Sequence, residues 1–208
     1  PALRRELAAA AAKRLDCPLV YLNQVGGNDE LIFDGGSFVI GPNGQQLLQL
    51  PICREQVAIW DSQVAASVVP QALHRWESLF RALVLGVRDY AAKCGFKQAL
   101  LGLSGGIDSA LVAVIAAAAL GNEAVSALLM PSPWSSEGSI NDATALADRL
   151  GLRHATVPIA DLMQGYDAAL MPALGEAPQG VTAENLQSRI RGTLLMAVAN
   201  QQGQLLLT

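Results

Sequence analysis

Apolar and polar positions follow different patterns in the two parts of the chain. In the first part, one amphipathic helix precedes short apolar runs that Gly, Pro and Asn separate, a pattern typical of antiparallel strands. A helix is predicted at residues 3–15, and strands at 19–23, 31–33, 37–40 and 45–50. A turn or loop is expected at 26–29, and a hairpin turn at 41–44, where Asn-Gly tolerates positive φ.

From residue 71 the apolar positions take on helical spacing, and a helix is predicted to run to residue 90. Strands are then expected at 99–103, 125–130, 153–157 and 205–208, and helices at 107–120, 141–150 and 184–200. Residues 163–180 are predicted to be a loop that holds at most a helical turn. Alternation of strands and helices at this spacing predicts an α/β fold with a doubly wound parallel sheet.

Because the two architectures differ, we expect two domains, at residues 1–62 and 71–208, joined by a linker at 63–70. The chain has 208 residues, of which 51% are hydrophobic and 15% charged, and its mean hydropathy is +0.31. This composition excludes a disordered tail. It is also apolar for a soluble protein, so we expect some of its surface to be covered by a partner or by further chain.

Charge, apolar run length and cysteine content limit the classes of partner and the cellular location that we expect. The net charge is −4, and the three lysines form no basic stripe, which argues against nucleic-acid binding. The longest apolar run, residues 110–120, is shorter than the roughly 20 residues that a membrane helix needs. No N-terminal signal is visible, and three widely spaced cysteines predict neither a disulfide framework nor a metal knuckle. A cytoplasmic location is therefore expected.

A glycine-rich loop between a predicted strand and a predicted helix carries the clearest chemistry. Its residues are Gly102, Leu103, Ser104, Gly105, Gly106, Ile107, Asp108 and Ser109. The glycines allow a close backbone approach, and the free N–H groups at the start of the next helix favour an anion. A carboxylate beside bound phosphates would repel them, so Asp108 suggests that Mg²⁺ lies between them.

The loop departs from two well-known glycine-rich patterns and matches a third. The Walker A pattern fails because no lysine follows the glycines, and the dinucleotide pattern G-x-G-x-x-G fails because Ser104 and Ile107 interrupt it. The serine-hydrolase pattern G-x-S-x-G does match and would make Ser104 a nucleophile. This alternative lacks an evident base, since His154 is the only downstream histidine and lies in an apolar strand pattern. A plain structural turn is the third possibility.

The loop Ser-Gly-Gly-Ile-Asp-Ser resembles the SGGxDS loop of the N-type ATP pyrophosphatases, which adenylate their substrates. Three further segments, 130–143, 184–192 and 21–37, resemble stretches of the glutamine-dependent NAD synthetases, in the family's order. The last of these is similar to the end of the nitrilase-like glutaminase domain of that family. The resemblance implies the C-terminal part of a nitrilase-like α/β sandwich, followed by an incomplete Rossmann-like synthetase domain.

The resemblance also implies a reaction and its ligands. Deamido-NAD would be adenylated by ATP with Mg²⁺, and ammonia from glutamine would displace AMP to give NAD. Residues 102–109 would bind the ATP phosphates, Asp108 would hold magnesium, and Met130 would pack near adenine. Asn185 and Arg189, which are i and i+4 on one helix face, would contact deamido-NAD.

Purely structural roles for these residues are also possible. Asn185 and Arg189 could form a solvated helix face, and Met130 could be simple strand core. His154 is expected to be structural, and Cys17 and Cys53 are expected to be ordinary thiols. The resemblance implies a homo-oligomer, at least a dimer.

Parts of the family pattern are absent from the sequence. The Glu–Lys–Cys triad of the glutaminase would lie upstream of residue 1, and a TGNKSE-like segment with a second magnesium ligand would follow residue 208. We therefore expect the 208-residue chain alone to have no glutaminase activity and little or no synthetase activity.

Overall fold

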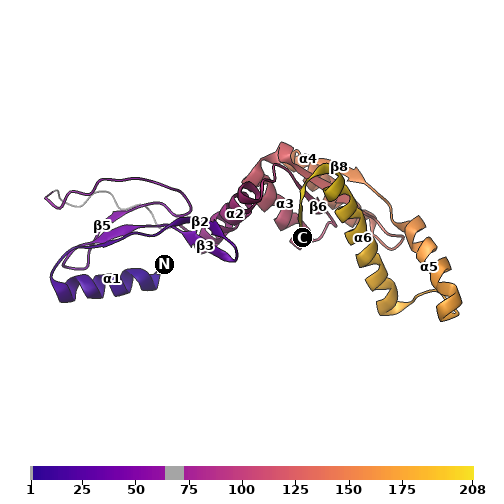
Figure 1. Ribbon diagram of the computed structural model, residues 1–208, viewed down its shortest axis with the longest axis horizontal. Helices are drawn as coiled ribbons and strands as arrows, with labels where there is room; N and C mark the ends of the chain where they lie inside the picture. Colours follow the sequence, from indigo (N-terminus) through magenta and orange to yellow (C-terminus); the bar gives the residue numbers. More distant parts are fainter. Residues whose placement is uncertain (1, 64–72) are drawn as a thin grey trace. The chain divides into compact units, whose positions relative to one another are not determined.

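The chain divides into two units, Pro1–Tyr90 and Ala91–Thr208. The computed structural model describes residues 2–63 and 73–208 (Figure 1). The predicted linker, apart from residue 63, and the first two residues of the predicted helix at 71–90 lie outside the described residues. The predicted domain limits at 62 and 71 stay a prediction.

One helix and a three-stranded antiparallel sheet form the core of the first unit. Helix α1 (Ala2–Leu15) precedes a sheet with strand order β1-β4-β5, made of β1 (Leu19–Tyr21), β4 (Phe38–Ile40) and β5 (Gln46–Gln49). Its buried side chains are Ala8, Ala12, Phe38 and Ile40. The predicted hairpin turn at 41–44 is confirmed, because the Gly44 N–H donates to the Gly41 carbonyl at 2.8 Å and Gly44 has φ +79°.

The predicted turn at residues 26–29 is wrong in part. Residues Val25–Asn28 form strand β2, which pairs antiparallel with β3 (Leu31–Asp34), and only the connection between them turns. The glycines have a packing role. A Cβ on Gly27 would lie 3.3 Å from the Gly86 Cα of helix α2 (Arg75–Cys94). Two glycines therefore let a strand backbone lie directly against a helix backbone, and the Gly27 N–H donates to Asp89 Oδ2 at 2.8 Å.

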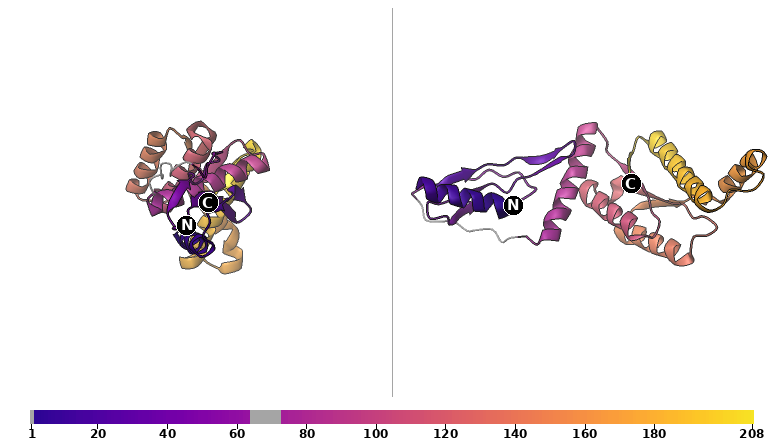
Figure 2. Two further views of the ribbon diagram at one scale, coloured as in Figure 1. Left: turned by 90° about the vertical axis from the view of Figure 1, so that its left-hand side faces the viewer. Right: turned by 90° about the horizontal axis from the view of Figure 1, so that it is seen from below.

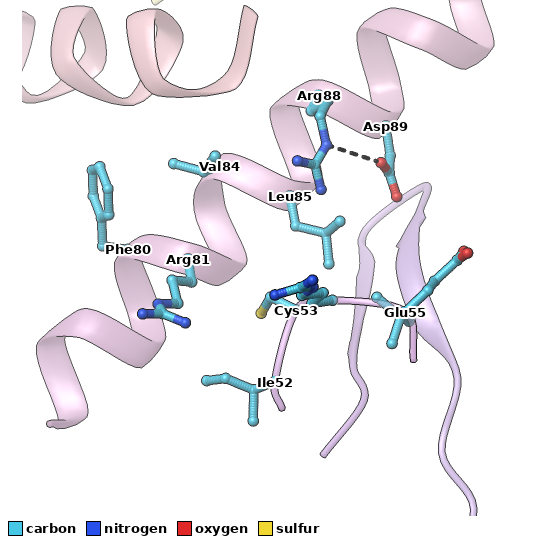
Figure 3. Close-up of a pocket in the computed structure, with 11 residues that line it drawn as sticks. Ile52, Cys53, Glu55, Phe80, Arg81, Val84, Leu85, Arg88 and Asp89 are labelled. Atoms are coloured by element: carbon cyan, nitrogen blue, oxygen red, sulfur yellow. Dashed lines mark ion pairs between the residues drawn. The ribbon is translucent and has the colours of Figure 1, made fainter. Parts of the chain in front are cut away.

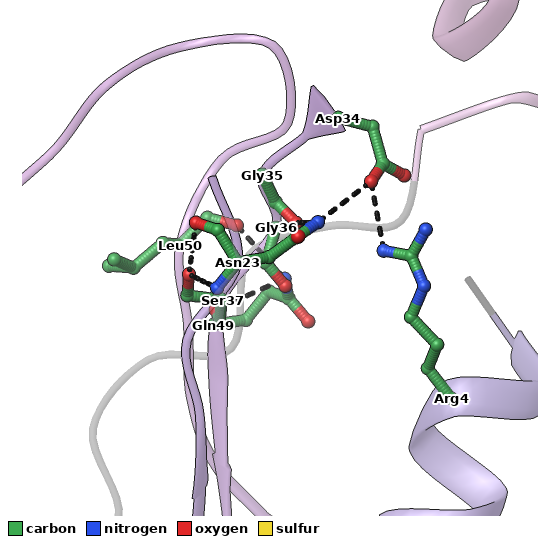
Figure 4. Close-up of polar contacts among 8 residues, drawn as sticks. All are labelled: Arg4, Asn23, Asp34, Gly35, Gly36, Ser37, Gln49 and Leu50. Atoms are coloured by element: carbon green, nitrogen blue, oxygen red, sulfur yellow. Dashed lines mark hydrogen bonds and ion pairs between the residues drawn. The ribbon is translucent and has the colours of Figure 1, made fainter. Parts of the chain in front are cut away.

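A polar network holds the strands of this unit together (Figure 4). The Asn23 side chain donates to Asp34 Oδ1 at 3.0 Å and to the Gly35 carbonyl at 2.9 Å. The buried Ser37 hydroxyl accepts from the Asn23 N–H at 2.9 Å. Arg4 of α1 completes the network with an ion pair to Asp34 at 2.8 Å, and this contact raises the pKa of the Arg4 guanidinium.

The second unit contains the predicted parallel sheet. Its strands are β6 (Ala99–Gly102), β7 (Val125–Leu129), β8 (Arg153–Thr156) and β9 (Leu205–Leu207), in the order β8-β7-β6-β9, and every neighbouring pair is parallel. Its helices are α3 (Ile107–Leu120), α4 (Glu137–Leu150), α5 (Ala160–Leu174) and α6 (Gly180–Gln202), with a short 3-10 turn, η1 (Asn122–Ala124), before β7.

Successive residues of the strands point to opposite faces of the sheet, and each face has its own core. Leu101, Ala127 and Leu129 pack with α3 and α4, whereas Leu100 and Leu128 pack with α5 and α6. The right-hand view of Figure 2 shows the two pairs of helices on opposite sides of the strands. The predicted doubly wound α/β arrangement is confirmed.

Three helix predictions in this unit need correction. Residues 160–174 form α5 and not a loop, although Pro172 lies inside the helix and removes one backbone donor. The helix ends at Gly175, which has φ +75°. Helix α4 begins at Glu137 and not at Asn141, because Ser136 caps it. Helix α6 begins at Gly180 and ends at Gln202, so it is longer at both ends than predicted.

Two further features concern the cysteines and the length of the helices. The three cysteines are free, with Cys17 and Cys94 exposed and Cys53 half-buried. Within residues 2–63 and 73–208, no helix is long and apolar enough to cross a membrane.

Candidate functional site

The loop between β6 and α3 adopts a conformation that only glycine permits at its centre. Gly105 has φ +82°, and a Cβ at this position would lie 2.2 Å from the carbonyl oxygen of Ser139 in α4. The loop backbone therefore lies directly against the first turn of α4. This close approach explains the glycine at position 105 without reference to any ligand.

Two serines close the loop on itself. The Ser109 hydroxyl accepts from the Ser104 N–H at 3.2 Å and lies 3.0 Å from the Ser104 hydroxyl. The Ser104 hydroxyl accepts in turn from the Gly106 N–H at 3.2 Å, and Ser109 donates to the Gly106 carbonyl at 3.0 Å. These bonds fix the curvature of the loop before any ligand binds, so its shape is preorganised.

The N-terminus of α3 is left free to bind an anion. The N-cap residue is Gly106, which offers no side-chain oxygen to the first-turn N–H groups. Ile107 and Asp108, the first two residues of the helix, are both exposed. Uncapped N–H groups and the helix dipole together favour a negatively charged group at this position.

A cavity of about 250 Å³ adjoins the loop at the carboxyl ends of β6 and β7. In open parallel sheets, ligands bind at this edge. Met130, which directly follows β7, is 8% exposed, belongs to the core on the α6 side and also lines the cavity. A Cβ on Gly102 would lie 3.3 Å from Met130 Cε and 3.2 Å from Leu195 Cδ1, so a side chain here would press on two side chains that line the cavity.

Helix α6 contributes one charged residue to this cavity, and it is not one that the sequence predicted. Arg191 lines the cavity, and its Nε donates to the Met130 carbonyl at 3.1 Å. The side chain is half-buried, and this burial lowers the pKa of the Arg191 guanidinium. By contrast, Asn185 and Arg189 are exposed on α6 and do not line the cavity.

Two family models match the chain. A carbon–nitrogen hydrolase model matches residues 1–67, and an NAD synthase model matches residues 79–208, more than half of the sequence. The chain belongs to the NAD synthase family. The nitrilase-like part that the resemblance implied is confirmed by the match at residues 1–67.

Curated relatives of this family extend over the whole chain. A glutamine-dependent NAD(+) synthetase from Synechocystis is 51% identical over 212 residues, which is 99% of this chain and 38% of the relative. The enzyme of the same name from Rhodobacter capsulatus is 46% identical over 99% of this chain and 39% of its own length. The chain thus spans less than half the length of these relatives.

Solved structures of NAD synthetases agree with the fold. A glutamine-dependent NAD+ synthetase from Acinetobacter baumannii, solved in complex with ADP, has a TM-score of 0.95 at 40% identity and covers 99% of this chain. The match takes in 40% of that structure. An NH3-dependent NAD synthetase from Campylobacter jejuni covers 64% of this chain and 56% of its own, with a TM-score of 0.57 at 29% identity.

The geometry does not favour the serine-hydrolase alternative. The Ser104 hydroxyl bonds to Ser109 and Gly106, whereas His154 lies on the edge strand β8 with its Nε2 3.0 Å from Asp148 Oδ1. The contact to Asp148 agrees with the structural role expected for His154. The membership in the NAD synthase family likewise favours the synthetase interpretation over a hydrolase.

Sequence reasoning missed Arg191 and Ser139, which both line the cavity. A signal for Arg191 was present, because it lies four residues before the buried Leu195 and so shares its helix face. Ser139 lies in the segment 130–143 that resembles the family, but its position against Gly105 depends on how α4 packs against the loop.

The first unit contains a larger cavity, of about 530 Å³, between helix α2 and the strand-and-loop region (Figure 3). Cys53, with φ +53°, faces it together with Arg81 and Arg88. Burial raises the pKa of the Cys53 thiol, and the nearby Asp34 raises it further. A thiol held neutral in this way is a poor nucleophile, which agrees with the expected ordinary role of Cys53.

Proposed function

We propose that the protein containing this chain catalyses the ATP-dependent amidation of deamido-NAD to NAD, with ammonia supplied from glutamine. The observation that carries this proposal is the preorganised SGGIDS loop at the uncapped N-terminus of α3, beside the cavity at the end of β7. The names of the relatives, glutamine-dependent NAD(+) synthetases, support the choice of substrates.

The chemistry explains why ATP is required. A carboxylate oxygen of the nicotinate group attacks the α-phosphorus of ATP, and the bond to pyrophosphate breaks. Ammonia then attacks the carbonyl carbon of the resulting adenylate, loses a proton, and AMP leaves with the former carboxylate oxygen. The uncapped N–H groups of the first turn of α3 would stabilise the charge that develops on pyrophosphate.

The residues present are suited to one magnesium ion held together with phosphates. Within the described residues no group of three or more His, Cys, Asp or Glu could form a metal cage. Mg²⁺ needs no such cage, because one or two carboxylates and substrate phosphates commonly hold it. Asp108, exposed in the first turn of α3, would be this carboxylate, and the bound ion would neutralise charge on the phosphates.

Residues 102–109 would therefore bind the ATP phosphates, and Met130 would pack near the adenine. Asn185 and Arg189 would contact deamido-NAD from the exposed face of α6. Their exposure supports this role, because a large dinucleotide needs an accessible surface. Residues 1–62 would belong to the glutaminase domain and residues 71–208 to the synthetase domain.

The proposal extends to the assembly and location of the protein. We propose a cytoplasmic homo-oligomer, at least a dimer. Large apolar side chains exposed on one helix, Leu162, Tyr166, Met171 and Leu174 of α5, support a further contact surface.

Isotope exchange tests the proposed reaction. The intact protein should exchange labelled pyrophosphate into ATP only when deamido-NAD is present, because adenylate formation is reversible. A matched assay with a different carboxylic acid, such as aspartate, should give no exchange. Exchange that is driven by another acid, or that is absent with deamido-NAD, would reject the assignment.

A further inference from the structure

We infer that Arg191 is a phosphate-binding residue of the cavity beside the loop, with its terminal Nη groups donating to a phosphoryl group of a bound nucleotide. The inference rests on the proposed function for the identity of the nucleotides. It adds a contact from α6 to those that the loop provides.

The charge of the cavity is the first argument. Among the described residues that line it, Arg191 is the only charged one. None of the ion pairs found between described residues involves Arg191. Desolvation without a compensating carboxylate is unfavourable for a cation, and a guanidinium cannot relieve this by losing its proton. An anionic ligand is therefore the partner that this site lacks.

The donors of Arg191 are the second argument. A guanidinium carries five N–H donors, and one of them, at Nε, is used by the Met130 carbonyl at 3.1 Å. This bond anchors the side chain at the carboxyl end of β7 and leaves the terminal Nη groups for a ligand. A planar pair of such groups matches the geometry of two phosphate oxygens.

Position is the third argument. The same cavity is lined by Gly102, Leu103 and Ser104, which lead into the anion-binding loop, and by the hydroxyl residues Ser135 and Ser139. A nucleotide in the cavity would thus contact both the start of the loop and Arg191. The phosphoryl group could come from ATP or from the dinucleotide, and these sources can be separated by experiment.

The test measures binding of AMP, adenosine and deamido-NAD to the intact protein by calorimetry. The variants are Arg191→Met, which removes the charge, and Arg191→Lys, which keeps it without the planar fork. Arg149→Met, at an exposed position in the last turn of α4, is the control. We expect Arg191→Met to weaken binding of AMP or of deamido-NAD at least 10-fold and to change adenosine binding less than 2-fold. Arg191→Lys should recover part of the loss.

The pattern of losses identifies the phosphate. Loss of AMP affinity assigns the contact to ATP, whereas loss of deamido-NAD affinity alone assigns it to the dinucleotide. Equal losses of affinity for AMP and adenosine would contradict the inference, because Arg191 would then act only through its contact with Met130. Unchanged affinity for both AMP and deamido-NAD would contradict it as well. If Arg191→Met does not fold, Arg191→Gln provides the same comparison. A failure of the proposed reaction would appear separately, as wild-type protein that does not exchange pyrophosphate with deamido-NAD.

Discussion

Gly105 determines the shape of the candidate phosphate loop more directly than any other residue. Both its positive φ and its distance to Ser139 exclude a side chain. Gly175, at the end of α5, also has a positive φ, yet among the described residues beyond its chain neighbours no atom lies within 4 Å of where its Cβ would be. Substitution of Gly175 therefore introduces backbone strain alone, whereas substitution of Gly105 introduces both backbone strain and steric overlap.

We predict that Gly105→Ala lowers kcat of the intact protein about 100-fold or more, because the loop must move away from α4 and a shift of about 1 Å at a reacting centre has this effect. Gly175→Ala should cost about 1–2 kcal/mol of local stability and leave kcat close to wild type. Steady-state kinetics of both variants is the measurement. Similar kcat values for the two variants would show that the contact with Ser139 does not control the loop.

We predict that Asp108 binds Mg²⁺ and contributes little to the stability of the fold. Asp108→Asn should raise the Mg²⁺ concentration for half-maximal pyrophosphate exchange about 10-fold or more, the size expected for a lost charged contact. Glu137→Gln, at an exposed acid in the first turn of α4, is the matched control and should leave it unchanged. An unchanged magnesium dependence in Asp108→Asn would remove Asp108 as a ligand.

Cys53 should be the least reactive of the three thiols, because burial raises its pKa above the ordinary value of 9.0. Its neutral form is favoured in the folded state, so this contribution to stability is present below pH 9 and is lost as the pH rises through the folded pKa. At pH 8, iodoacetamide should label Cys53 at least about 10-fold more slowly than Cys17 and Cys94, as followed by peptide mass mapping. In urea, as a control, the three thiols should be labelled at equal rates. Equal labelling rates in the folded protein would contradict the prediction.

At the scale of elements, the strands and helices of the second unit were largely predictable. Strands 125–130 and 153–157 and helix 107–120 agree with the structure to within a residue or two at each end, because apolar periodicity is strong in a buried parallel sheet. The prediction of a loop was wrong at α5, because Gly165 and Pro172 are residues that usually interrupt helices, although Met163 packs in the core. The prediction of a turn was wrong in part at β2, whose glycines serve contact with α2.

Helix α4 has an N-cap that the sequence interpretation overlooked. The Ser136 hydroxyl accepts from the Ser139 N–H at 3.1 Å, which fixes the turn that touches Gly105. Ser136→Ala should weaken this turn by about 1 kcal/mol, so the Ser139 amide hydrogen should exchange about 5-fold faster. Ser188→Ala, at an exposed position of α6, should not change that rate. Equal exchange rates for both variants would show that the cap is dispensable.

The candidate site was only partly predictable for a related reason. The loop 104–109 could be identified because its residues are contiguous and their types suit phosphate. Arg191 and Ser139 join the same cavity from two other helices, and such a meeting depends on the packing of α4 and α6 on the sheet. Contiguous motifs are therefore visible in a sequence, whereas convergence of distant side chains needs the fold.

At the scale of the whole molecule, the chain matches two family models in sequence order, a carbon–nitrogen hydrolase model at residues 1–67 and an NAD synthase model at 79–208. This order is the one that the proposed function requires, in which one part releases ammonia and the other uses it. The loop after β6 would bind the ATP that the proposed synthetase reaction needs, so the proposed function depends on what that loop binds.

A crystal structure of the intact protein with a non-hydrolysable ATP analogue and Mg²⁺ is the most direct test. We predict that the phosphates lie against the loop 104–109, at the first-turn N–H groups of α3, with the metal ion beside the Asp108 carboxylate. Phosphates that lie elsewhere, with this loop free of ligand, would contradict the account.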